Sequence, residues 1–156
     1  MKKLFAIILA VALLMGLSVT AFAANTTGGD ADITTSIDPT YTVTIPADVN
    51  VAFNATETAF GTIEVTASQI HPDKCIKVAL ATDKELNNAI DNTKVIPYAI
   101  KDSEGATFTS ATYLTEGDKT ELSIHITAND WNAAYAGEYS DTVTFTVSYV
   151  DKAANN

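Results

Sequence analysis

The sequence predicts an all-β protein, an antiparallel β-sandwich of seven to nine strands with at most one short helix. Apolar and polar residues alternate along most of the chain, which is typical of strands with one buried and one solvated face. Turn-forming groups such as Asp38-Pro39 and Ser103-Glu104-Gly105 separate the alternating runs. Many short strands spaced by turns indicate two packed antiparallel sheets.

The alternating runs differ in strength. The strongest cover residues 41–45, 63–67, 75–80, 122–127 and 142–149. Weaker runs cover residues 33–37, 49–53, 95–101 and 106–114. Pro97 lacks the amide that a central strand must donate, so its strand is expected at an edge or at a bulge.

Two segments have helical features. Residues 83–92 place Leu86, Ala89 and Ile90 at helical spacing, and both a short helix and a polar loop remain open there. Residues 129–136 are expected to coil for one turn, with Asn129 or Asp130 as the N-cap.

The N-terminal 23 residues have the three parts of a secretory signal peptide. Lys2 and Lys3 precede an apolar run over residues 4–19, and Ala21-Phe22-Ala23 has the small-x-small pattern of a cleavage site. The run is shorter than the ~20 apolar residues of a spanning helix. We therefore expect a secreted protein that works outside the cytoplasmic membrane, without a membrane contact after cleavage.

The mature chain is expected to form one domain. Residues 24–32 are polar and contain glycine, which predicts a flexible N-terminus. Residues 33–150 are assigned to the β-sandwich domain and residues 151–156 to a polar C-terminal tail.

Composition excludes several classes of function. The chain carries a net charge of −10, which disfavours nucleic acid and anionic lipid as partners. Cys75 is the only cysteine, so no internal disulfide can form. His71, Asp73 and Cys75 supply at most three metal ligands, and no motif for a nucleophile or a phosphate loop is present. We expect no metal, no cofactor and no enzymatic activity.

The last alternating run has the features of a terminal sandwich strand. Gly137 is expected to release the chain from a turn, and the hydroxyl of Tyr139 to tie the strand to the preceding corner. Val143, Phe145, Val147 and Tyr149 are expected to be buried, whereas Thr144, Thr146 and Ser148 face solvent. This segment, residues 135–149, resembles the last strand of bacterial immunoglobulin-like surface domains, among them spore coat protein U and related fimbrial subunits. The resemblance implies an immunoglobulin-like sandwich.

Two functional hypotheses follow. The first is a non-enzymatic structural or adhesive domain that binds a surface protein, or a second copy of itself, by adding a strand to an open sheet edge. The alternative is a small carbohydrate-binding module in which Trp131 and Tyr135 stack on a glycan. Against the alternative, Trp131 could instead plug one end of the core.

Overall fold

The computed structural model describes residue 30 and residues 32–153, so the predicted signal peptide and the end of the tail lie outside it. The chain divides into a unit that ends at Thr35 and a second unit that begins at Ser36. Asp30 and residues 32–35 of the first unit are exposed coil. None of the helices in the described ranges is long and apolar enough to cross a membrane.

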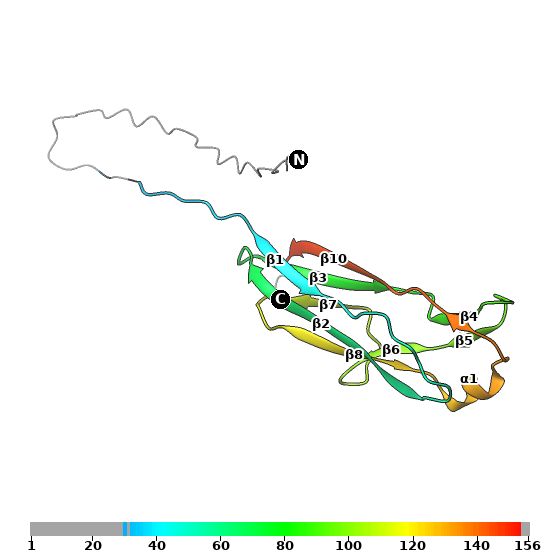
Figure 1. Cartoon of the computed structure of the whole chain (residues 1–156). Helices are drawn as coiled ribbons and strands as arrows, with labels where there is room; N and C mark the ends of the chain where they lie inside the picture. The colour runs from blue at the N-terminus through cyan, green and yellow to red at the C-terminus, as the bar shows by residue number, and fades with distance from the viewer. Residues whose placement is uncertain (1–29, 31, 154–156) are drawn as a thin grey trace, which may run out of the picture. The chain divides into compact units, whose positions relative to one another are not determined.

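The second unit contains ten strands and one short helix (Figure 1). The elements are β1 (Thr40–Thr44), β2 (Glu57–Gln69), β3 (Lys74–Ala81), β4 (Glu85–Asn88), β5 (Val95–Pro97), β6 (Ala99–Asp102), β7 (Ser110–Tyr113), β8 (Lys119–His125), α1 (Ala128–Ala133), β9 (Tyr139–Ser140) and β10 (Thr144–Asp151). All strand pairs are antiparallel. The all-β sandwich is therefore confirmed, with ten strands rather than seven to nine.

The strands form two larger sheets and one small one. The first sheet has the order β1-β2-β8-β6, the second β10-β3-β7, and the small sheet β5-β4-β9. The small sheet and α1 lie at one end of the unit, away from the end where β1 begins and β10 finishes (Figure 1). Pro97 is the last residue of the edge strand β5, as its missing amide predicts.

The core lies between the two larger sheets. Strands β2 and β8 contribute one side of it and β3 and β7 the other, because their apolar residues recur at every second position. Its fully buried members include Ile63, Val65, Ile76, Val78, Ile100 and Ile126. Cys75, which precedes Ile76 in β3, is buried and has a free thiol.

Strand β10 differs from the prediction. Val143, Phe145 and Tyr149 are only half-buried, and Val147 is exposed at 38%. Thr144 and Thr146 are exposed as expected, but Ser148 is half-buried. The physical reason is the position of β10 at the edge of its sheet, where the facing sheet covers its inner side only in part.

Other segments also differ from the sequence-based expectations. Residues 33–37 and 49–53 are not strands, and Ile33 and Phe53 are exposed at 98% and 78%. Residues 83–92 hold strand β4 and a turn rather than a helix. The N-cap of α1 is Thr127, whose hydroxyl accepts a hydrogen bond from the Asp130 amide at 3.2 Å; neither Asn129 nor Asp130 has that role.

Candidate functional site: a cleft between two sheet edges

The candidate site lies between β1 and β10, the edge strands of the two larger sheets. Toward the start of β1 the edges are bridged by Tyr41 and Tyr149, whose ring centroids are 5.8 Å apart. Further along, Phe60 and Phe145 approach to 5.9 Å. Beyond that pair, the chain after β1 and the chain before β10 border two neighbouring hollows of about 460 and 690 Å³. We call these two hollows together the edge cleft.

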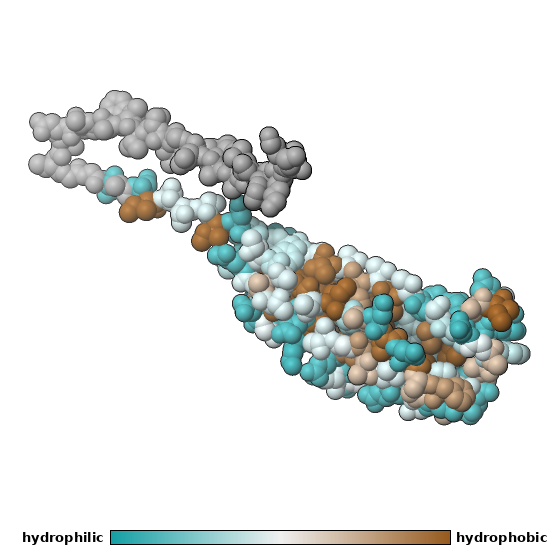
Figure 2. Space-filling model, in the orientation of Figure 1, coloured by the Kyte–Doolittle hydropathy of each residue, from teal (hydrophilic) through white to brown (hydrophobic). Residues whose placement is uncertain are grey.

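The two hollows share their middle and differ at their ends. Val49, Val51, Leu86 and Asp141 line both of them. The first hollow extends to apolar residues of the strand edges, namely Ile45, Phe60, Val143 and Phe145. The second extends to aromatic and polar residues near α1, namely Phe53, Trp131, Glu138 and Tyr139. On the face shown in Figure 2, apolar patches lie over the middle of the domain and toward the end that carries α1.

Gly61 lets one wall of the cleft approach strand β2. It lies at an irregularity in the register of β2 with β8, with φ +132°. A Cβ at this position would be 3.1 Å from Cβ of Pro46, which belongs to the wall segment. Glycine is therefore needed both for the backbone angle and for the close contact.

A hydrogen-bonded carboxylate stands where the two hollows meet. Asp141 Oδ2 accepts hydrogen bonds from the hydroxyls of Tyr98 and of Thr82, the latter at 2.7 Å, and Oδ1 accepts from the Thr142 amide at 2.6 Å. Burial, and then the hydrogen bond to Asp141, raises the pKa of Tyr98 well above its ordinary range. The Tyr98 hydroxyl thus stays a neutral donor at physiological pH, and it holds the carboxylate in place.

The backbone of β10 is open toward the cleft side. The Leu80 amide donates to the Thr109 carbonyl at 2.9 Å, so Leu80 directs its backbone groups toward β7. Phe145 is the residue opposite Leu80, and its own N–H and C=O therefore point away from β3. The same holds two residues later at Val147. Among the described residues, β10 has no strand partner on that side.

The two aromatic residues predicted to bind a glycan differ in burial and contacts. Trp131 is half-buried, packs against the core and donates its indole N–H to the Ala55 carbonyl at 2.8 Å. Phe53 packs edge-on against it, with ring centroids 5.6 Å apart. Tyr135 is 64% exposed, and the Lys94 ammonium lies 5.1 Å from its ring centroid. Trp131 lines the second hollow, and Tyr135 is not among its lining residues.

The turn before β9 is built as a tied corner. The Tyr139 hydroxyl donates to the Tyr135 carbonyl at 2.9 Å, which is the bond expected for a tyrosine at this place. Gly137 has φ +149°, and a Cβ there would lie 2.5 Å from Nδ2 of buried Asn88. Asn88 Oδ1 accepts from the Ile90 and Asp91 amides and so orders the next loop.

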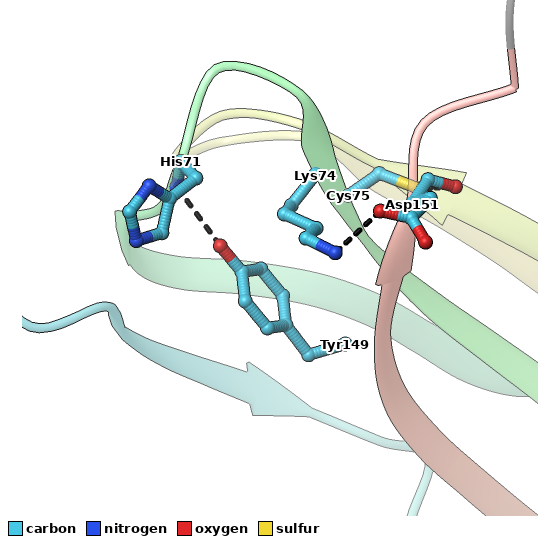
Figure 3. A network of polar contacts seen from close by, with 5 residues as sticks. All are labelled: His71, Lys74, Cys75, Tyr149 and Asp151. Carbon is cyan, nitrogen blue, oxygen red and sulfur yellow. Dashed lines mark hydrogen bonds and ion pairs between the residues drawn. The ribbon is translucent and has the colours of Figure 1, made fainter.

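A second polar cluster lies at the hairpin between β2 and β3 (Figure 3). The His71 amide donates to the Tyr149 hydroxyl at 2.9 Å, and Lys74 forms an ion pair with Asp151. The Cys75 thiol faces the Asp151 carbonyl, 3.9 Å away. These contacts fasten the end of β10 to the hairpin. No group of metal-ligating side chains is found in the part of the chain that the structure describes.

Ser123, His125 and Glu57 form a cluster that sequence analysis did not anticipate. Ser123 Oγ lies 2.9 Å and Glu57 Oε1 3.9 Å from the same atom, His125 Nε2. A catalytic triad needs the serine and the acid on different ring nitrogens, so that one orients the imidazole while the other loses its proton. This cluster therefore lacks the geometry of a nucleophile and base.

Comparisons with known proteins show a likeness of fold and no match in sequence. No protein-family model and no curated protein matches the sequence. The fold is similar to a chain in a solved structure of a chaperone–tip adhesin complex from CFA/I fimbriae biogenesis, with a TM-score of 0.46 and 10% identity. That match covers 72% of this chain and 43% of the other, so this chain spans less than half the length of the protein it matches.

Proposed function

We propose that this protein is a secreted, non-enzymatic domain of a bacterial cell surface that binds an extended segment of a partner chain in the edge cleft. The role is structural or adhesive. The observation that supports it is the open edge of β10 beside an apolar cleft. Secretion rests on the predicted signal peptide.

Strand addition uses the features that meet in this cleft. An added strand gains main-chain hydrogen bonds from a free edge, and its alternate side chains enter pockets that set specificity. Strand β10 offers the outward backbone groups of Phe145 and Val147. The first hollow offers apolar contacts to every second side chain of a bound segment. Val147, 38% exposed, lies outside the two hollows, on the same edge two residues beyond Phe145, and would lose contact with water where the bound segment continues along β10.

The test uses the mature protein and a set of labelled peptides in which valine and threonine alternate. The peptides differ only at the central residue, which is lysine, norleucine or glutamate. Fluorescence anisotropy measures their binding. We expect at least one peptide to bind, and Val147→Pro to weaken it about tenfold or more, because proline removes an outward amide without touching the β3 ladder.

Thr112→Pro is the matched control. By the same register argument Thr112 has outward backbone groups, but it lies on β7 at the opposite edge of the same sheet. This variant should leave peptide binding unchanged. If neither edge variant alters binding, or if no peptide binds, strand addition at β10 is wrong. Binding on a glycan array that Trp131→Ala abolishes and Val147→Pro leaves intact would favour the carbohydrate-binding alternative.

A further inference from the structure

We infer that the segment bound in the edge cleft belongs to a different protein and carries a lysine or arginine that pairs with Asp141. The inference rests on the proposed function and names the chemistry of the partner. It follows from the charges in the cleft, from the remaining acceptor capacity of Asp141 and from the composition of this chain's own N-terminal segment.

The charges that line the cleft have one sign. Asp48 lies in the first hollow, Glu138 in the second, and Asp141 in both. No lysine or arginine lines either hollow among the described residues. Around these carboxylates the first hollow is mainly apolar, through Ile45, Val143 and similar side chains.

Asp141 has room for one more donor. A carboxylate accepts about four hydrogen bonds, and Asp141 receives three, from Tyr98, Thr82 and Thr142. Two of these occupy Oδ2, so the free acceptor position is on Oδ1. A segment that covered the cleft would remove water from this oxygen, and an unpaired buried carboxylate is costly. A basic side chain in the segment satisfies the carboxylate and is attracted more strongly there than at an open surface.

A second copy of this chain is a poor source of such a segment. Residues 24–38, the N-terminal part of the mature chain, contain Asp30, Asp32 and Asp38 and no lysine or arginine. Docked in the cleft, they would place like charges beside Asp48 and Asp141. The net charge of −10 adds repulsion between whole copies and attraction toward a basic partner.

The experiment compares the three peptides described above, together with a peptide of residues 24–38, on wild-type protein and four variants, Asp141→Asn, Asp48→Asn, Glu116→Gln and Val147→Pro. We expect the lysine peptide to bind about tenfold more tightly than the glutamate peptide, with norleucine between them. Asp141→Asn should remove the advantage of the lysine peptide over the norleucine peptide, whatever its effect on binding of all the peptides together. Asp48→Asn should reduce the advantage by a smaller factor, since Asp48 is exposed.

Glu116→Gln removes one charge in a turn outside the cleft and is the control for net charge. It should leave the lysine preference intact. If the lysine, norleucine and glutamate peptides bound equally well and Val147→Pro weakened all three, this inference would be wrong and the proposed function would stand. Tighter binding of the 24–38 peptide than of the lysine peptide would overturn it in favour of a second copy. Absence of all peptide binding would instead refute the proposed function.

Discussion

Asp118 shows how one carboxylate organises a turn between two core strands. Its Oδ2 accepts the Leu114 and Thr115 amides at 2.7 and 2.9 Å, and its Oδ1 accepts the Thr115 hydroxyl at 3.1 Å. The Leu114 amide, followed by the Thr115 amide, lowers the pKa of Asp118 below 3.8. Because the folded state holds the ionised form, its stabilisation is full above about pH 4 and is lost as the pH falls through the lowered pKa.

Asp118→Ala should therefore lower the free energy of unfolding by about 1 kcal/mol at neutral pH, the value of a typical hydrogen-bonded turn residue. The difference from wild type should shrink as the pH falls below about 4 and through the lowered pKa, because the carboxylate then becomes protonated in the wild type. Urea unfolding of both proteins at neutral pH and at acidic pH measures this difference in the free energy of unfolding. Glu116→Ala, in the same turn, should have little effect at either pH. An unchanged cost of Asp118→Ala across this range would show that charge is not the stabilising feature.

Gly137 and Gly105 allow a comparison of two causes of strain. Both have positive φ, but a Cβ at Gly105 meets nothing within 4 Å, whereas one at Gly137 meets Asn88 at 2.5 Å. Gly105→Ala should cost about 1 kcal/mol through the backbone alone. Gly137→Ala should cost more, about 2–3 kcal/mol, because Asn88 must also move. Denaturant melts that ranked the two in the opposite order would contradict the close packing of Asn88 against the corner.

The emission of Trp131, the single tryptophan, reports on the second hollow. Half-burial and the indole hydrogen bond to Ala55 predict a native spectrum that is blue-shifted relative to the unfolded chain. Oligosaccharide titration should leave the spectrum unchanged, since the indole packs against the core and against the ring of Phe53. If the emission shifted on titration and Tyr135→Ala abolished the shift, Trp131 and Tyr135 would bind the sugar together, as the carbohydrate-binding alternative states.

At the scale of elements, β3 and β10 are neighbours with different burial. Val78 is fully buried, and its partner in the register, Val147, is 38% exposed. Val78→Ala should cost about 2 kcal/mol or more and Val147→Ala less than about 1 kcal/mol. Urea unfolding of the two variants checks the difference. Equal costs would mean that β10 is covered in solution by something bound at its edge.

The sequence predicted strands well where the alternation of apolar and polar residues is enough to locate them. The alternation of apolar and polar residues located β2, β3 and β8 correctly, because the facing sheet covers the inner side of each of these strands. The same signal in β10 overstated burial, since alternation reports which side a residue faces and not how far the opposite sheet extends. In residues 83–92 the helical spacing of Leu86, Ala89 and Ile90 was misleading, because pairing with β5 and β9 outweighs local preference there.

The candidate site was largely beyond sequence analysis. Phe53, Asp141 and the wall segment after β1 come together only through the meeting of two sheet edges. No motif connects residues that lie about ninety positions apart. The features that the sequence did supply were local ones, such as the Gly137 turn and the Tyr139 corner.

For the molecule as a whole, the predicted signal peptide leads to a direct test. The protein recovered from culture medium should begin at Ala24 or one residue later, because Ala21-Phe22-Ala23 has the pattern of a cleavage site. N-terminal sequencing or intact mass measures it. A recovered chain that still begins at Met1 would refute export by cleavage and, with it, the surface role.

The ladder between β3 and β10 joins residues that are far apart in the chain, from Lys74 paired with Asp151 to Ala81 paired with Thr144. During synthesis and export, β3 therefore has no such partner until residues 144–151 have emerged. Closing so long a loop is slow compared with forming a hairpin. The second sheet therefore closes only after its last strand has been made, and this late closure suits the export that the proposed function requires.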